Sequence, residues 1–209
     1  MKNMKTRDEP ALNLPPMVKK LTLVNIGVFL FMYFFPDSER LYALAFVPAR
    51  YSGGDAMEFA AIVSPFTHLF VHAGWLHLLV NGGMLMAFGA GLENRIGGRR
   101  LLLFYIASGL GGALLHALVY PGADSPMIGA SGAISGLFGG VLMMMHSTGA
   151  AIDYKKLLPF AAVWIGVSVF FGFAGMPGVD NPIAWTAHIG GFVSGLLLYR
   201  LGPFQPRRS

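Results

Sequence analysis

The sequence has no cysteine and unusually little charge. Without cysteine, a disulfide framework, a thiolate metal site and a cysteine nucleophile are all excluded. Charged residues make up 12% of the 209 residues, about half of the roughly 25% that a soluble domain usually carries, and 55% of the residues are hydrophobic. This balance excludes an ordinary water-soluble globule and a disordered chain. The 28 glycines follow no Gly-X-Y period, which excludes a collagen-like fibre.

What the sequence does contain is a series of long apolar segments. A helix that crosses a bilayer needs about 20 mostly apolar residues, and six segments reach or approach this length: 18–35, 66–92, 101–120, 131–146, 156–174 and 184–201. The stretches between them are rich in turn-forming or charged residues. The sequence therefore predicts an all-α, polytopic membrane protein, a six-transmembrane-helix bundle over residues 18–201, flanked by cytoplasmic tails at 1–17 and 202–209.

Lysine and arginine are distributed unevenly between the two sides of this predicted bundle. Thirteen of the fifteen lie in the N-terminal tail, at the C-terminal end or in the two loops on the same side. Only Arg40 and Arg50 lie on the other side. Positive residues favour the cytoplasmic side of a membrane, so both termini are expected in the cytoplasm. The formal net charge of +5 thus reflects membrane topology, and because no single stripe collects it, a nucleic-acid partner is not expected.

Two regions depart from a simple set of equal spans. The loop from Pro36 to about Pro65 is long, external and contains aromatic residues, which suits a loop that lies partly in the membrane interface. The fourth segment has only sixteen residues, about 24 Å of helix against a hydrocarbon core of roughly 30 Å. We therefore expect a short central helix 4 whose outer end begins inside the membrane, with the preceding glycine-rich stretch dipping down to reach it.

Polar side chains inside apolar spans are costly and often functional. The second segment carries His77 and Asn81. The fourth segment opens at Ser131, and the sixth contains His188. Counted from the cytoplasmic ends of their segments, all four lie about 18–24 Å into the membrane. Four polar side chains from three helices in one layer indicate a shared polar cavity. Two further histidines assigned to the second segment are expected to organise water or the loop: His68 and His72.

The residues of this layer suit nucleophilic catalysis by serine. Ser131 is a candidate nucleophile, and His188 is a candidate general base that would take its proton. His77 and Asn81 lie one helical turn apart on one face, where they would donate to a developing oxyanion together with a backbone N–H at Ser131. Gly129 lets backbone and substrate approach closely. No Asp or Glu lies deep in any segment, so a serine–histidine dyad is the simplest arrangement, and a triad would need a loop acid to descend.

Gly191 and Gly195 are spaced four residues apart in the sixth segment. Small residues at this spacing let membrane helices approach closely. We expect this face to bring the sixth segment against a neighbour, the fourth segment in particular. That contact would set the separation of Ser131 and His188.

The order and spacing of these motifs resemble the rhomboid intramembrane serine proteases. The shared motifs are His72, His77 and Asn81 in one span, Gly129-Ala130-Ser131-Gly132 at the head of another, and Ala187-His188 followed by small residues in the last. The resemblance covers about residues 18–201, and the six-span plan with both ends inside matches the minimal bacterial form. Glu93 and Arg95, at the inner end of the second span, also resemble a family feature with a structural role.

The resemblance implies an enzyme that cleaves the transmembrane helices of other proteins. Ser131 would be the nucleophile and His188 the general base, with His77 and Asn81 around the oxyanion. The resemblance implies no metal and no cofactor. It implies transmembrane protein substrates and the lipid bilayer as partners, and a location in the bacterial cytoplasmic (inner) membrane.

The resemblance also implies substrate binding by Gly129 and Trp164, the latter in a fifth span that would serve as a gate for substrate entry. One departure from the family pattern concerns the general base. Many members place an aromatic residue four positions after the nucleophile, where it stacks on the catalytic histidine, and this chain has Ser135 there. We therefore expect another aromatic residue or a tighter helix contact to hold His188.

Two other interpretations stay open. Ser131 and His188 would serve only in helix packing if the chain were a catalytically silent rhomboid-like protein that binds membrane helices without cutting them. The polar layer would instead be a binding site if the chain were a transporter or channel. Such proteins use paired carboxylates or broken-helix repeats, and the sequence has neither an acidic residue deep in a span nor a duplicated half.

Overall fold

The structure is a computed structural model, and it describes residues 14–52, 59–147, 154–175, 184–201 and 204. The predicted tails lie almost entirely outside these residues. The helices, in chain order, are α1 (Pro16–Phe34), α2 (Ser38–Leu44), the 3₁₀ helix η1 (Pro48–Tyr51), α3 (Phe59–Thr67), the 3₁₀ helix η2 (His68–Phe70), α4 (Trp75–Ile96), α5 (Gly98–Val119), α6 (Ser131–Ser147), α7 (Tyr154–Ala174) and α8 (Trp185–Arg200). Among the described residues, β-type pairing is confined to an isolated antiparallel bridge between Phe46 and Met127.

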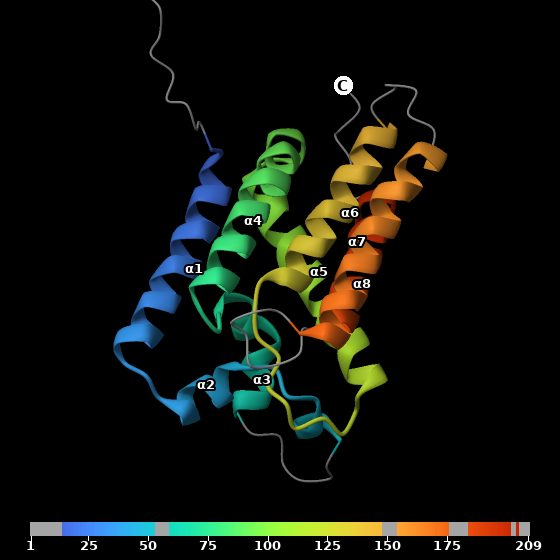
Figure 1. Cartoon of the computed structure of the whole chain (residues 1–209). Helices are drawn as coiled ribbons and strands as arrows, with labels where there is room; N and C mark the ends of the chain where they lie inside the picture. The colour runs from blue at the N-terminus through green and yellow to red at the C-terminus, as the bar shows by residue number, and fades with distance from the viewer. Residues whose placement is uncertain (1–13, 53–58, 148–153, 176–183, 202–203, 205–209) are drawn as a thin grey trace, which may run out of the picture.

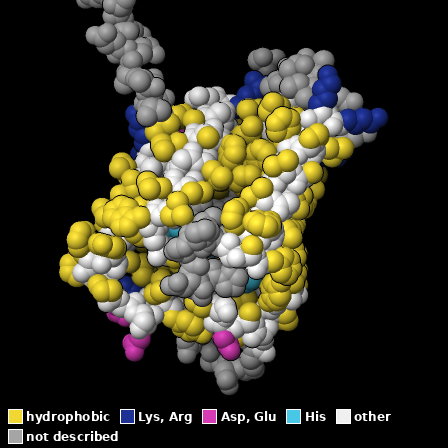
Figure 2. Space-filling view, in the orientation of Figure 1, with side chains coloured by type: hydrophobic (Ala, Val, Ile, Leu, Met, Phe, Trp, Pro, Cys, Tyr) yellow, Lys and Arg dark blue, Asp and Glu magenta, His cyan; other side chains and the backbone are white. Residues whose placement is uncertain are grey.

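The longer helices run side by side as a bundle, with α2 and α3 across one end (Figure 1). Four of the described helices, α1, α4, α5 and α7, are long and apolar enough to cross a membrane. The shorter α6 and α8, of 17 and 16 residues, pack against each other and against α5. Large apolar side chains are exposed along the outside of the bundle, as Figure 2 shows for the face in view. The predicted class, an all-α polytopic membrane bundle, is confirmed.

Each of the six predicted segments overlaps one long helix of the bundle, and five of them agree with that helix within three residues at both ends. The second prediction, 66–92, is wrong, because the helix there is α4, Trp75–Ile96. The apolar stretch before it completes α3, forms η2 and then runs extended into Gly74, which has φ −176° and ψ 175°. Hydropathy alone does not distinguish this buried turn from a helix. His68 and His72 therefore precede the spanning helix instead of lying on it.

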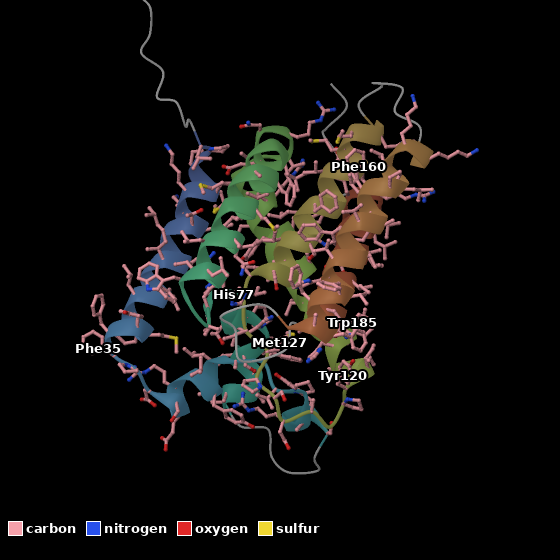
Figure 3. The ribbon with its side chains drawn as sticks, viewed as in Figure 1. Phe35, His77, Tyr120, Met127, Phe160 and Trp185 are labelled. Atoms are coloured by element: carbon pink, nitrogen blue, oxygen red, sulfur yellow. The ribbon has the colours of Figure 1, made fainter. Side chains whose placement is uncertain are left out.

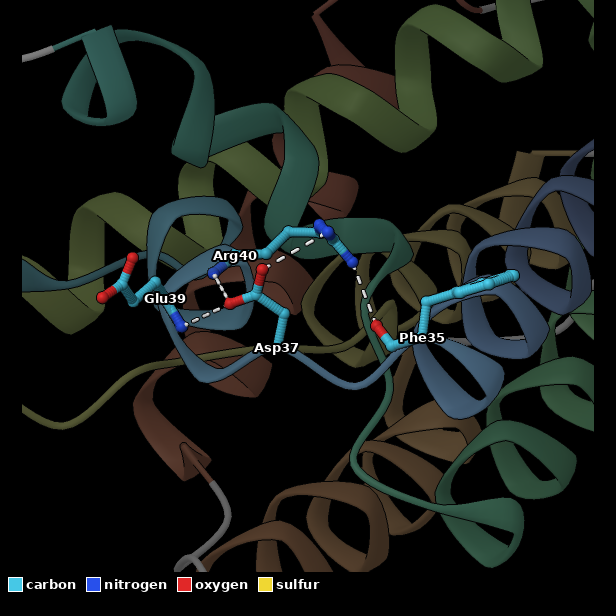
Figure 4. A network of polar contacts seen from close by, with 4 residues as sticks. All are labelled: Phe35, Asp37, Glu39 and Arg40. Atoms are coloured by element: carbon cyan, nitrogen blue, oxygen red, sulfur yellow. Dashed lines mark hydrogen bonds and ion pairs between the residues drawn. The ribbon is translucent and has the colours of Figure 1, made fainter.

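The long connection between α1 and α4 is folded into short helices. The carboxylate of Asp37 caps α2 by accepting from the backbone N–H groups of Glu39 and Arg40, at 3.0 and 3.1 Å. The Arg40 guanidinium pairs with Asp37 at 3.3 Å and donates to the carbonyl of Phe35 at 3.0 Å (Figure 4). These contacts fix the sharp corner between α1 and α2.

The first turn of α1 is capped by a residue from another helix. Pro15 precedes α1 and offers no side-chain cap. The Glu93 carboxylate of α4 accepts from the backbone N–H of Met17 at 2.9 Å and from that of Val18 at 2.8 Å. Glu93 is buried, and its charge faces the positive end of the α1 dipole. These contacts give Glu93 the structural role that was expected of it.

Glycines allow α6 and α8 to cross in backbone contact. A Cβ built on Gly191 would overlap the carbonyl of Gly132, and one built on Gly195 would overlap the carbonyl of Gly136. The prediction that the small-residue face of the sixth segment packs against the fourth is confirmed. This close crossing brings the N-terminal halves of both helices together.

Candidate active site

A cavity of about 360 Å³ lies among the helices that carry the polar layer. His77 and Asn81 of α4 line it, as do Ser131 of α6 and His188 of α8. The structure therefore brings together the four side chains that the sequence placed at one depth. Figure 3 labels two lining residues, His77 and Met127, close to the end of the bundle that α2 and α3 cover.

The chain reaches Ser131 through a non-helical stretch that pairs with other parts of the molecule. Met127 exchanges two backbone hydrogen bonds with Phe46, at 2.8 and 3.0 Å. The N–H of Gly129 donates to the carbonyl of His68 at 2.9 Å. Non-helical backbone is tolerated at membrane depth only where it is buried in protein or lines a wet cavity. These bonds meet that requirement and fix the start of α6, of which Ser131 is the first residue.

Gly129 lies directly against His77. Its φ of +117° is a conformation that residues with a Cβ rarely adopt. A Cβ there would come within 2.6 Å of His77 Nε2 and 2.7 Å of its Cε1. Gly129 and Trp164, the two expected substrate-binding residues, both line the cavity. Within the chain, Gly129 contacts the imidazole of His77, which is one of the two residues expected at the oxyanion.

His77 and Asn81 each have an N–H group available at the cavity. Nδ1 of His77 accepts from the backbone N–H of Ala73 at 3.4 Å, which leaves Nε2 as the protonated nitrogen of the neutral ring. The side-chain nitrogen of Asn81 is buried and has no hydrogen-bond partner among the described residues. Leaving a buried amide without a partner costs free energy. A donor kept free at this cost is suited to a charge that develops only during a reaction.

The ring of His188 is held by a residue of α7. Its Nδ1 lies 3.1 Å from Oγ of Ser168. The Ser168 hydroxyl donates its own hydrogen to the backbone carbonyl of Trp164 at 2.8 Å. The observed hydrogen-bond partner of His188 is thus a hydroxyl, and the expected tighter helix contact is present beside it, where a Cβ on Gly132 would lie 3.3 Å from the Ala187 carbonyl oxygen. The sequence analysis did not single out Ser168.

Ser135 occupies the position where an aromatic residue was expected, and it makes two hydrogen bonds. Its hydroxyl donates to the carbonyl of Ser131 at 2.8 Å. Its Oγ accepts from the indole Nε1–H of Trp164 at 3.3 Å. Ser135 is fully buried, so these bonds satisfy a polar group that would otherwise be costly.

Backbone contact between α6 and α8 occurs next to both candidate reacting groups. A Cβ on Gly132 would lie 3.3 Å from the carbonyl oxygen of Ala187. Gly132 follows Ser131, and Ala187 precedes His188. The side chains of Ser131 and His188 therefore extend from neighbouring positions on two helices that are in contact. A direct proton transfer between them requires such proximity.

His68 and His72 are buried in the segment before α4. Nδ1 of His68 lies 2.8 Å from the carbonyl of Ser64, and Nδ1 of His72 lies 3.2 Å from the carbonyl of Phe70. Burial lowers the pKa of His72 to about 4, with a smaller contribution from His77. His72 is therefore neutral at neutral pH. The two histidines brace the turn that leads into α4, in agreement with the organising role expected of them.

The fold and the cavity together define a polytopic helical membrane protein with a serine and a histidine facing one internal cavity. The family model described as the Rhomboid domain matches residues 61–202, more than half of the chain. The chain belongs to the rhomboid family.

Several curated relatives are similar over the same part of the chain. RHOMBOID-like protein 4 of Arabidopsis thaliana is 39% identical over 129 residues, 62% of this chain and 31% of that protein. RHOMBOID-like protein 1 of the same plant is 38% identical over 135 residues, 64% of this chain and 32% of that protein. Rhomboid-like protease 5 of Toxoplasma gondii is 34% identical over 130 residues, 62% of this chain and 15% of that protein. The chain thus spans about a third of the length of these plant relatives.

Proposed function

We propose that this protein is an intramembrane serine endopeptidase that hydrolyses peptide bonds in or near transmembrane helices of other membrane proteins. The observation that carries the proposal is the cavity itself. Ser131 and His188 line it together with two side-chain donors from α4, among helices whose outer surfaces are apolar. Membership of the rhomboid family and the protease name of the Toxoplasma relative support the same class of function.

Acylation of Ser131 is the first half of the proposed reaction. Nε2 of His188 takes the hydroxyl proton while Oγ of Ser131 bonds to the carbonyl carbon of the scissile peptide. The carbonyl oxygen becomes negative and accepts from His77, Asn81 and the backbone N–H of the nucleophile. The N-terminal end of α6 adds a favourable potential there. The C–N bond then breaks, the histidine protonates the leaving amine, and the acyl group stays on Oγ.

Deacylation repeats these steps with water. His188 takes a proton from water, whose oxygen bonds to the ester carbon. The bond to Oγ then breaks, and the proton returns to Ser131. A water molecule occupies about 30 Å³ of liquid, so a cavity of about 360 Å³ holds several beside a peptide segment. Neither a metal nor a cofactor takes part in the proposed reaction.

The hydrogen bonding of a helix bears on the form of the substrate. In an intact helix the carbonyl of each peptide bond is already hydrogen-bonded and is shielded by the neighbouring turns, so the substrate is proposed to enter locally unwound. Glycine or proline near the cleaved bond would favour this unwinding. Gly129 and Trp164 are the proposed contacts of the peptide.

The distribution of charge supports the proposed orientation. In Figure 2, Lys and Arg side chains gather at the end where α1 begins and α6 ends, and Asp and Glu side chains appear at the opposite end. The basic end is the one that faces the cytoplasm in membrane proteins. We therefore place both termini in the cytoplasm and the cavity in the outer half of the bilayer. The proposed location in a bacterial inner membrane rests on the resemblance to the minimal bacterial form of the family.

Cleavage of a model transmembrane substrate in proteoliposomes tests the proposed function. The wild-type protein should release two fragments of the substrate. Ser131→Ala and His188→Ala should each release none above background while keeping the wild-type melting temperature in detergent. Full activity in either variant would refute the dyad. A folded wild-type protein that binds the substrate without cutting it would instead be the catalytically silent rhomboid-like protein.

A further inference from the structure

A chain of hydrogen bonds joins the base to the nucleophile through α7. On the side of the base, Nδ1 of His188 lies 3.1 Å from Ser168 Oγ, and Ser168 donates to the Trp164 carbonyl at 2.8 Å. On the side of the nucleophile, the Trp164 indole donates to Ser135 at 3.3 Å, and Ser135 donates to the Ser131 carbonyl at 2.8 Å. Trp164 thus belongs to both halves, through its backbone and its side chain.

The direction of these bonds determines which tautomer His188 adopts. A serine hydroxyl has a single hydrogen to donate. The Trp164 carbonyl can only accept, and it lies closer to Ser168 Oγ, at 2.8 Å, than Nδ1 of His188 does, at 3.1 Å. We therefore assign the hydroxyl hydrogen to the carbonyl, so that a lone pair of the oxygen faces the imidazole. With this assignment Nδ1 of His188 carries the ring proton, and Nε2 keeps its lone pair. This is the tautomer that a general base needs, because the other one has no free lone pair at Nε2.

We propose that Ser168 is a positioning residue for His188. It holds Nδ1 protonated and directed toward α7, so that Nε2 is the nitrogen that accepts the proton of Ser131. This inference rests on the proposed dyad function. In a catalytic triad a carboxylate does this work. No Asp or Glu is among the described residues that line the cavity, whereas Ser168 does line it.

The surroundings of Ser168 make its hydroxyl hard to replace. Ser168 is 5% exposed, so bulk water has little access to the Nδ1 side of the ring. α7 is also the least enclosed of the four long helices, because 11% of the residues in its most apolar stretch are buried, against 22–39% in the others. The orientation of His188 therefore depends on a helix that is held to the bundle by few other contacts.

Substrate kinetics of three variants test this role. Ser168→Ala should lower kcat about 10–100-fold, since it removes a hydrogen bond to a ring that becomes charged, and should change KM less than about 3-fold. Ser168→Thr keeps the hydroxyl and should recover most of the lost kcat. Ser108→Ala removes an equally buried serine hydroxyl of α5 that lies outside the cavity lining. It should keep kcat within about 3-fold of the wild type.

NMR of protein labelled with ¹⁵N in histidine alone gives an independent reading of the tautomer. The signals of His188 are those that vanish in His188→Ala. Wild type should show a protonated Nδ1 at His188, and Ser168→Ala should shift the ring toward protonated Nε2. A protonated Nε2 in the wild type, or a wild-type kcat in Ser168→Ala, would overturn the inference. Failure of the dyad itself would appear separately, as cleavage retained in Ser131→Ala.

Discussion

Gly191 of α8 lies so close to Gly132 of α6 that a Cβ on Gly191 would overlap the Gly132 carbonyl. Gly132 adjoins Ser131, and Gly191 lies less than one helical turn from His188. The separation of the proposed nucleophile and base is therefore set by backbone contact between two helices. Side-chain packing has little part in it, because glycine has no side chain to adjust.

Gly191→Ala is expected to push α6 and α8 apart. Overpacking of this kind costs about 1–3 kcal/mol, and a displacement of reacting groups by about 1 Å costs on the order of 100-fold in rate. We expect a lower melting temperature in detergent and a loss of cleavage of about that size. Gly27→Ala on α1 is the control, because a Cβ there meets nothing within 4 Å. A Gly191→Ala variant with the stability and rate of the wild type would contradict the contact.

Gly129→Ala is expected to abolish most activity by displacing His77. The added Cβ would lie 2.6 Å from Nε2, and φ is +117°. Gly97→Ala separates the two causes, since Gly97 also has a positive φ of +84° but no neighbour within 4 Å. Cleavage assays should show a large loss only for Gly129→Ala. Equal losses in both variants would assign the effect to backbone strain alone.

Asn81→Ala is expected to separate activity from stability. Loss of one oxyanion donor lowers kcat about 10–1000-fold by analogy with serine proteases. The amide nitrogen of Asn81 is buried without a partner among the described residues, so its removal should leave the melting temperature unchanged or raise it. Parallel measurements of kcat and thermal unfolding check both expectations. A strongly destabilised variant with normal kcat would indicate a helix-packing role.

Glu93 is expected to matter for stability and not for chemistry. Hydrogen bonds to a charged group contribute about 1.5–3 kcal/mol each, and Glu93→Ala removes two of them at the start of α1. Glu93→Gln keeps one acceptor and should cost less. Unfolding in denaturing detergent should show the highest stability for the wild type, a lower one for Glu93→Gln and the lowest for Glu93→Ala, with equal activity per folded molecule. A Glu93→Ala variant that is as stable as the wild type would show that water replaces the carboxylate.

The helices were predictable because bilayer thickness imposes a length and an apolar composition on each span. The start of α4 at Trp75 was not predictable in this way, because the preceding turn is as apolar as a helix. Burial of that turn depends on partners distant in sequence. The carbonyl of His68, for example, accepts from the N–H of Gly129.

The candidate site was predictable for polar residues that lie at the same depth in different apolar segments. Ser131, His188, His77 and Asn81 are polar groups at one level of an apolar chain, and all four line the cavity. The partner of His188 was not predictable, because a hydrogen bond between helices depends on their rotation and crossing. The only available signal was that Ser168 is the single serine in the stretch of α7 that follows its two lysines and is otherwise apolar.

Labelling with a serine-directed fluorophosphonate, located by mass spectrometry, tests most directly whether His188 activates Ser131. Wild-type protein in detergent should carry one adduct, on the peptide that contains Ser131. Ser131→Ala should carry none, and His188→Ala should react at least about 100-fold more slowly. An adduct on a different residue, or equal labelling rates in wild type and His188→Ala, would contradict the proposed dyad.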